Sequence, residues 1–173
     1  MKTQKTQISF EKLLTTSHFK KALKEMDIHD PTQVQERAIP LICEGKDVIC
    51  HANTGSGKTI AFALPIAEQL KETDGLQALV LVPTRELCEQ VTEELRKITK
   101  YHPLQILDVY GGVSIENQIR KIKDTHVIVA TPGRLLDLLN RRAVRLDSIK
   151  TLVLDEADRM LDMGFIKDVE TIM

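Results

Sequence analysis

Short apolar runs alternate with amphipathic segments along most of the chain. The runs occupy residues 48–50, 78–82, 106–110, 127–130 and 152–154. Runs this short, continuous and β-branched are typical of strands buried on both faces of a parallel sheet. After the second run, one helical stripe carries Leu87, Val91, Leu95 and Ile98, while glutamate and lysine occupy the other positions. The pattern predicts an α/β fold with a mostly parallel central sheet, helices on both faces, and a helical region at about 10–43 before the first strand.

Polar or glycine-rich turns follow all of these runs. They are residues 52–59, residues 83–87, Gly111-Gly112, residues 131–134 and residues 155–158. The carboxyl ends of parallel strands share the edge of a sheet at which such folds bind ligands. We therefore expect an extended binding surface at that edge, although Gly111-Gly112 alone is equally compatible with an ordinary turn.

The first of these turns has the composition of a phosphate-binding loop that opens a helix. The loop proper reads Thr54, Gly55, Ser56, Gly57, Lys58 and Thr59. Glycines let backbone N–H groups converge on phosphate oxygens, and the amino end of the helix adds partial positive charge. Lys58 is expected to reach the β- and γ-phosphates, and the Thr59 hydroxyl to ligate Mg²⁺. The usual pattern begins with glycine, and the small Ala52 stands there instead.

Two carboxylates directly follow the last apolar run. Asp155 ends a strand expected to be buried, where a carboxylate needs a partner, and Mg²⁺ held partly through water would supply one. Glu156 could orient and deprotonate an attacking water. Taken singly, Asp155 suits a helix N-cap and Glu156 a charge in the first turn. Beside a phosphate loop, catalytic roles are favoured for Lys58, Asp155 and Glu156, and we expect folding to bring Lys58, Thr59 and Asp155 around one triphosphate–magnesium pocket.

Composition restricts the class of protein without identifying it. The 173 residues carry 25 acidic and 24 basic side chains, so any polyanion must be bound locally rather than by a global field. Cys43, Cys50 and Cys88 show no metal-ligand spacing and are interpreted as reduced, mostly buried thiols. Neither a signal core nor a membrane-length apolar run occurs. These features predict a cytoplasmic protein without a membrane partner. The fragment itself is expected to be a monomer, although the features of the sequence do not determine its oligomeric state.

These motifs together resemble the N-terminal RecA-like domain of DEAD-box ATP-dependent RNA helicases. Residues 31–35 resemble the adenine-reading Q motif of that family, with Gln35 as its glutamine. Phe10 is similar to the upstream aromatic that packs on adenine in the family. Asp27, Ile28 and Gln33 depart from the usual Q motif, whereas Gln35 can still pair both a donor and an acceptor with adenine. The resemblance, and the absence of an Asn-Lys-x-Asp sequence, imply ATP and Mg²⁺ as cofactors rather than GTP.

The resemblance also implies an RNA-binding surface. It assigns contacts with the sugar-phosphate backbone to Thr84, Arg85, Gly111, Gly112, Thr131, Pro132, Gly133 and Arg134. Arginine pairs with phosphate and glycine permits close approach, so binding is expected to be independent of base sequence. Aromatic residues make up only 3% of the chain, which leaves few platforms for base stacking. Asp158 is implied in coupling between domains.

The resemblance divides the chain into a helical region with the Q motif at 1–45 and a RecA-like ATP-binding core at 46–173. The family continues with a Ser-Ala-Thr strand and a second RecA-like domain, whose arginines contact the γ-phosphate. Both are missing from these residues, so the chain is expected to bind nucleotide but hydrolyse little. The second domain and RNA are therefore the expected partners.

Other functions remain compatible with the motifs. One is a nucleotide-dependent RNA clamp or adaptor that does not require hydrolysis, against which the intact Lys58, Asp155 and Glu156 argue. Another is a P-loop kinase or small-molecule ATPase unrelated to RNA. A DNA helicase is mechanistically nearest, but the Q motif and the presence of Asp158 rather than histidine favour RNA.

Overall fold

The computed structural model describes residues 9–13, 16–72 and 75–173. The chain forms two compact units. The first contains the residues up to Gln69 together with Lys97–His102, and the second contains Leu70–Arg96 and Pro103–Met173. The domain boundary near residue 45 that the sequence suggests stays a prediction.

The first unit is helical in its described part. Its helices are α1 (Phe10–Leu13), α2 (Ser17–Glu25), α3 (Gln33–Cys43) and α4 (Lys58–Gln69). Helix α3 packs against both α4 and α1. Helix α4 continues through Pro65, whose ring is buried along with most of the apolar residues around it. Lys100 of the segment 97–102 donates a 2.7 Å hydrogen bond to Glu25 at the end of α2.

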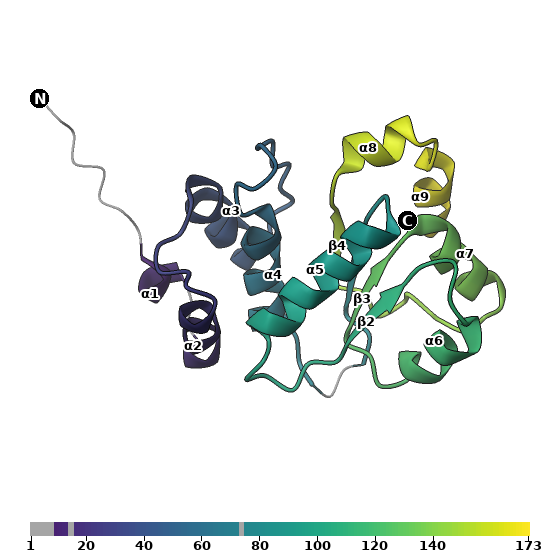
Figure 1. Cartoon of the computed structure of the whole chain (residues 1–173), viewed down its shortest axis with the longest axis horizontal. Helices are drawn as coiled ribbons and strands as arrows, with labels where there is room; N and C mark the ends of the chain where they lie inside the picture. The colour runs from purple at the N-terminus through teal and green to yellow at the C-terminus, as the bar shows by residue number, and fades with distance from the viewer. Residues whose placement is uncertain (1–8, 14–15, 73–74) are drawn as a thin grey trace, which may run out of the picture. The chain divides into compact units, whose positions relative to one another are not determined.

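The second unit is built on a four-stranded parallel sheet (Figure 1). Its strands are β1 (Ala78–Leu81), β2 (Ile106–Val109), β3 (Val127–Ala130) and β4 (Thr151–Leu154), in the spatial order β2-β3-β1-β4. The helices are α5 (Arg85–Ile98), α6 (Ile115–Ile122), α7 (Pro132–Asn140), α8 (Ala157–Asp162) and α9 (Ile166–Ile172). The predicted α/β sheet is confirmed for these four strands.

Strand register explains how the sheet buries one face. Leu79 pairs with Ile128, and Ile128 with Leu107, so alternate residues of neighbouring strands form rows on the same face. These rows join the core that Leu135 and Leu138 of α7 complete. Figure 1 shows α5 on one side of the sheet and α6 and α7 on the other.

The strand predicted at 48–50 is wrong. The described residues form no strand there, and Ile49 is fully exposed at 101%. A strand needs a neighbour that accepts and donates its backbone hydrogen bonds, and the described residues of the first unit, to which 48–50 belong, contain no strand that could pair with it. Burial on both faces is also wrong for β4, where Leu152 and Leu154 are each 38% exposed. Among the described strands, β4 is an edge strand that pairs with β1 alone.

The expectation of mostly buried thiols is wrong for two of the three cysteines. Cys43 and Cys50 are exposed, and only Cys88 is buried. Cys43 is the last residue of α3, and Cys50 lies in the segment that forms no strand. Burial raises the pKa of the Cys88 thiol to about 12, so this thiol stays protonated and unreactive near neutral pH. Its Sγ–H donates to the Val129 carbonyl at 3.1 Å and fastens α5 to β3.

None of the helices in the described ranges is both long and apolar enough to cross a bilayer.

Candidate functional site

The predicted phosphate loop lies immediately before α4. Two of its residues, Gly55 and Gly57, have φ angles of +77° and +87°, which turn the backbone tightly into the helix. The Lys58 ammonium donates to the carbonyl oxygens of Ala52 at 2.6 Å and Asn53 at 3.0 Å. The loop therefore curls around its own lysine, which places one positive charge at the amino end of α4. Such an end attracts anions through its free N–H groups as well as its charge.

Helix α3 is joined to this loop by its first turn. The Thr32 hydroxyl donates to the Ser56 carbonyl at 2.8 Å, and the Gln35 Nε2 group donates to the Gly57 carbonyl at 3.1 Å. Gln35 Oε1 also accepts from the Thr32 N–H at 2.9 Å as part of a capping box. Gln35 is only 1% exposed. Because its amide is bonded to the Gly57 carbonyl, a change in the conformation of the loop would alter that hydrogen bond.

This geometry gives Gln35 a function that sequence analysis missed. The amide was expected to read adenine, and here its donor and acceptor bind the backbone of Gly57 and Thr32. Phe10, the other expected adenine contact, lies in α1 and is 5% exposed. Helix α1 packs on α3, so Phe10 lies on the element that supports Gln35.

Gly57→Ala is expected to destabilise the chain more than an alanine substitution at another left-handed glycine. A Cβ at Gly57 would lie 2.4 Å from Gln35 Nε2, whereas a Cβ at Gly45, with φ of +73°, meets nothing within 4 Å. Both variants carry the backbone cost of about 1–2 kcal/mol, and only Gly57→Ala also displaces the Gln35 amide. Denaturant unfolding of both variants measures the difference. Equal losses of stability would show that the Gln35–Gly57 contact contributes nothing.

The acidic turn after β4 has an unusual backbone. Glu156 adopts the left-handed conformation, with φ of 50° and ψ of 47°, and serves as the N-cap residue of α8. Asp155 precedes the cap, and its Oδ1 accepts from the Glu156 N–H at 3.1 Å. The N-cap interpretation of Asp155 is therefore wrong. A non-glycine residue at positive φ costs energy and is concentrated at functional sites. The Glu156 carboxylate accepts from Arg159 Nη1 at 3.1 Å, and Asp158 is exposed on the first turn of α8.

Both implied cofactors match the chemistry of the residues present. Thr59 carries a hydroxyl and Asp155 a carboxylate. Magnesium binds oxygen ligands, usually keeps several waters and takes only one or two protein ligands beside the phosphates, so the chemistry of each residue suits it. Position 57 has no room for a side chain, because a Cβ there would lie 2.4 Å from Gln35 Nε2. A glycine at this position fits a nucleotide loop, in which backbone N–H groups face the phosphate.

The turns after β1 and β2 lie beside each other at the carboxyl edge of the sheet. Arg85, the first residue of α5, places its guanidinium 4.9 Å from the centre of the Tyr110 ring. A Cβ on Gly112 would lie 3.8 Å from Arg85 Nη1. Hydrogen bonds from the Tyr110 hydroxyl and from Arg85 lower the pKa of the Glu89 carboxyl, which therefore stays ionised beside Arg85. The Thr84 hydroxyl accepts from the Leu87 N–H at 3.2 Å and caps α5.

The turn after β3 contacts the turn after β2. Thr131 is the N-cap residue of α7, Pro132 follows it at the first helical position, and Gly133 is exposed. Arg134 Nη1 donates to the Val113 carbonyl at 3.1 Å and to Gln118 Oε1 at 2.9 Å. The predicted RNA residues of three separate turns are thus connected within the second unit.

The structure distributes the predicted site residues over both units. Phe10, Gln35 and the loop 54–59 belong to the first unit, and Asp155, Glu156, Asp158 and the predicted RNA residues belong to the second. Sequence reasoning placed Thr32 in the Q motif without a role of its own, and it missed Tyr110 and Gln118. Gln118 could have been found, because it is a polar residue on the helical stripe that Ile115, Ile119 and Ile122 define.

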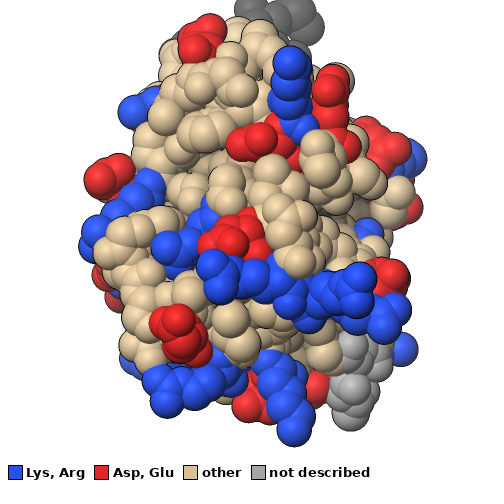
Figure 2. Space-filling view, turned by 90° about the vertical axis from the view of Figure 1, so that its right-hand side faces the viewer, with Lys and Arg blue, Asp and Glu red and all other residues tan. Residues whose placement is uncertain are grey.

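Surface charge is mixed rather than uniformly basic. Figure 2, which faces the side that carries α6 and α7, shows Lys and Arg side chains gathered in a band with Asp and Glu among them. Arg141 and Arg145 pair with Asp137 and Asp147 at 2.8 Å each. These two arginines therefore fit a solvated, charge-balanced surface.

Comparison with known proteins gives consistent matches. The family model described as DEAD/DEAH box helicase matches residues 32–173. The DEAD-box ATP-dependent RNA helicase CshA of Bacillus licheniformis is 49% identical over 96% of this chain, which spans 34% of that protein. The RNA helicase CrhR of Synechocystis is 48% identical over 87% of the chain and 31% of its own length. A crystal structure of a DEAD box protein from Methanococcus jannaschii matches with a TM-score of 0.92 and 40% identity, over 96% of this chain and 46% of that one.

Proposed function

The chain belongs to the DEAD/DEAH box helicase family, and we propose that it is the N-terminal ATP-binding half of an ATP-dependent RNA helicase. It spans only about a third of the curated relatives that it matches. The proposal for the whole protein is ATP hydrolysis coupled to RNA binding and to local unwinding of a duplex. The partners are RNA, bound through its backbone, and a second RecA-like domain, to which Asp158 couples.

The hydrogen bond between Gln35 and Gly57 is the observation that carries this proposal. It connects the residue assigned to adenine with the loop assigned to the phosphates. Binding of phosphate at the loop can therefore change the position of the Gln35 amide, and binding of adenine at Gln35 can change the loop. The Gln35 amide has two N–H donors and an oxygen with two lone pairs. One donor and one acceptor site bind Gly57 and Thr32, so the second donor and second lone pair are the groups proposed to pair with adenine. Phe10, on the helix that packs against α3, is the proposed apolar support for the same base.

Each catalytic residue has a proposed role in phosphate chemistry. Lys58 and the loop 54–59 hold the phosphates, and Thr59 and Asp155 hold Mg²⁺, the latter partly through water. Magnesium supplies charge neutralisation at the phosphate oxygens. Glu156 orients the attacking water and accepts its proton. Arg159, which binds the Glu156 carboxylate, restricts where that carboxylate can reach.

The positions of Arg85, Gly112 and Arg134 support backbone binding of RNA. These residues come from three turns at one edge of the sheet, and two of them carry a guanidinium suited to phosphate. No base-specific contact is required of them, so the proposed binding is independent of sequence. Two exposed free thiols, Cys43 and Cys50, suit a reducing compartment and support a cytoplasmic location.

Arg85→Ala and Arg134→Ala are each expected to weaken binding of single-stranded RNA about tenfold, because each loses a charged hydrogen bond to phosphate. Each change should also lower the slope of affinity against salt concentration by about one. Fluorescence anisotropy with oligouridylate at several salt concentrations measures both quantities. Arg145→Ala, which removes an exposed arginine paired with Asp147, is the matched control. Unchanged affinity in both Arg85→Ala and Arg134→Ala would overturn the RNA part of the proposal.

The 173 residues alone are expected to hydrolyse ATP slowly even with RNA present. In related phosphate chemistry, an arginine supplied from another domain raises turnover by about three to five orders of magnitude, and here that arginine is proposed to come from the second domain. A phosphate-release assay with and without RNA measures the rate. Strong RNA-stimulated hydrolysis by this chain would contradict the proposal that the second domain supplies an arginine needed for turnover.

A further inference from the structure

Gln118 is a buried polar residue on an otherwise apolar helical stripe. It lies on α6 and is 5% exposed, while Ile115, Ile119 and Ile122 on the same side of the helix pack against the core. A primary amide in such a place is costly unless both its donor and its acceptor find partners. Leucine or methionine would fill this position at lower cost, so the amide calls for a specific explanation.

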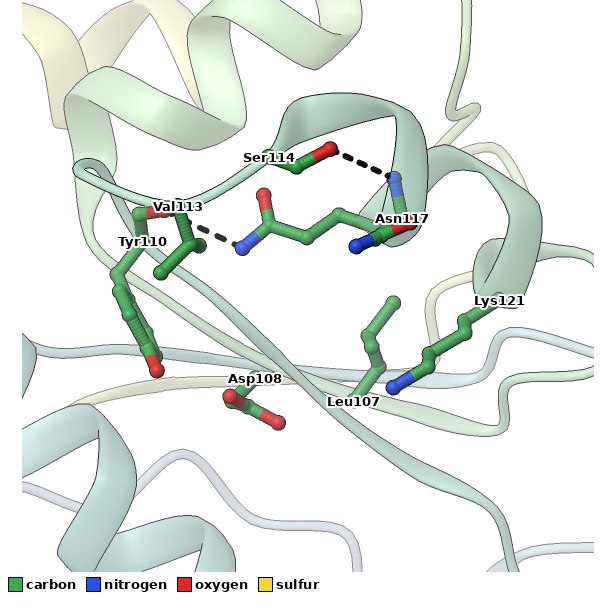
Figure 3. Close-up of a pocket in the computed structure, with 8 residues that line it drawn as sticks. Leu107, Asp108, Tyr110, Val113, Ser114, Asn117 and Lys121 are labelled. Carbon is green, nitrogen blue, oxygen red and sulfur yellow. Dashed lines mark hydrogen bonds between the residues drawn. The ribbon is translucent and has the colours of Figure 1, made fainter.

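The two ends of the Gln118 amide bind different turns. Its Nε2 group donates to the Tyr110 carbonyl at 3.2 Å, a bond drawn as a dashed line beside Tyr110 and Val113 in Figure 3. Its Oε1 atom accepts from Arg134 Nη1 at 2.9 Å. The same Arg134 nitrogen donates to the Val113 carbonyl at 3.1 Å. Gln118 therefore ties the turn after β3 to both sides of the Gly111-Gly112 turn after β2.

Tyr110 extends this connection to the turn after β1. Its carbonyl accepts from Gln118, and its ring lies under the Arg85 guanidinium at 4.9 Å. Arg85 and Arg134 are thus held by one residue, the first through the ring and the second through the amide of Gln118. Both recorded bonds of Arg134 use Nη1. The remaining guanidinium nitrogens, Nε and Nη2, have no recorded partner among the described residues and form the edge that binds phosphate in a bidentate manner.

We infer that Gln118 is a positioning residue for the RNA backbone, which sets the separation and orientation of Arg134 relative to Arg85 and the glycine turn. The inference rests on the proposed function, because it assigns Gln118 to the support of residues that are themselves proposed to bind RNA. Gln118 is buried and acts through Arg134 and the Tyr110 carbonyl rather than by touching RNA.

A purely structural role for Gln118 makes a different prediction, and the chain offers a matched control for it. Gln77 is also a fully buried glutamine of the second unit, and its amide binds the backbone of Lys71 and Gly75. None of its recorded bonds reaches a predicted RNA residue. Replacement of either glutamine by methionine removes one amide at similar volume. Gln118 also lines an open surface pocket of about 190 Å³, so the side chain at this position is not enclosed on every side.

The test compares Gln118→Met, Gln77→Met, Arg134→Ala and the double variant Gln118→Met/Arg134→Ala in binding of oligouridylate over a range of salt concentrations. Gln118→Met is expected to lower affinity about tenfold and to lower the salt slope by about one, as loss of one phosphate contact does. The double variant is expected to fall within about twofold of Arg134→Ala, because both changes remove the same contact. Gln77→Met, which loses a comparable amide, is expected to leave both quantities unchanged.

Other results would overturn either the proposed RNA site or the role of Gln118. If Arg85→Ala and Arg134→Ala leave RNA affinity unchanged, the proposed RNA site fails and the inference fails with it. If the arginine variants weaken binding while Gln118→Met does not, the inference alone fails. If Gln77→Met reduces affinity as much as Gln118→Met, or if the losses in the double variant simply add, Gln118 acts only through general stability and the inference is wrong.

Discussion

Glu156→Gln is expected to lower the rate of ATP hydrolysis by the full-length protein by about two to four orders of magnitude. An amide cannot accept the proton of the attacking water, and this is the usual size of the general-base contribution. Glutamine has nearly the same shape, so the left-handed backbone at position 156 and the contact with Arg159 can persist. The loss is therefore assigned to the proton-accepting step rather than to a displaced α8.

The Glu156→Gln variant is measured by steady-state phosphate release with saturating RNA, together with nucleotide and RNA affinities. Nucleotide and RNA should still bind, and RNA should be released more slowly because hydrolysis no longer resets the protein. Glu170→Gln, at an exposed position on α9 of the same unit, is the matched control and should leave turnover unchanged. Normal turnover in Glu156→Gln would remove its catalytic role. Normal RNA release without turnover would favour the nucleotide-dependent clamp instead.

Lys58→Met is expected to weaken ATP binding by about tenfold to a hundredfold, because a hydrogen bond to a charged group contributes about 1.5–3 kcal/mol. The Lys58 ammonium already lies inside the loop, bonded to the carbonyl oxygens of Ala52 and Asn53. Exchange of these neutral acceptors for phosphate oxygens would strengthen its bonds. Methionine keeps an unbranched apolar chain in the loop without the charge.

Titration of the 173-residue chain with a fluorescent ATP analogue and Mg²⁺ measures the effect of Lys58→Met. Lys46→Met is the matched control, since Lys46 belongs to the same unit and pairs at the surface with Glu44. The double variant Lys58→Met/Asp155→Asn asks whether both residues act on one ligand, in which case their effects are less than additive. Unchanged affinity in Lys58→Met would exclude a phosphate-binding role for this loop.

Much of the second unit follows from its sequence pattern. The runs at 78–82, 106–110, 127–130 and 152–154 each contain or overlap an observed strand. The helix after β1 was also predicted, although Cys88 rather than the half-buried Leu87 lies on its buried stripe with Val91 and Leu95. These elements were predictable because a continuous β-branched run or a helical stripe reflects its own local periodicity. The run at 48–50 has the same local character, but the described residues of its own unit contain no strand that could pair with it.

The candidate site was predictable to the extent that its chemistry is local. The loop 54–59, the carboxylates Asp155 and Glu156, and the arginines Arg85 and Arg134 stand next to predicted strands and helices. The signals that located them are glycine spacing, charge and the position of a turn. The functions of Thr32, Tyr110 and Gln118 depend instead on hydrogen bonds and contacts with residues in other elements. The local sequence around these three residues does not indicate which residues those are.

The sequence by itself was sufficient to predict the α/β class and the family resemblance. It also located the segments suited to bind phosphate, metal and RNA. Side-chain chemistry and periodicities of two or 3.6 residues operate over short stretches of chain and can be recognised there. Tertiary structure alone decided that Gln35 binds Gly57, that Gln118 joins Arg134 to Tyr110, that Glu156 takes a left-handed backbone and that Ile49 stays exposed. Hydrogen bonds and burial of this kind arise between elements distant in sequence, because each buried polar group must find whatever partner the folded chain brings within reach.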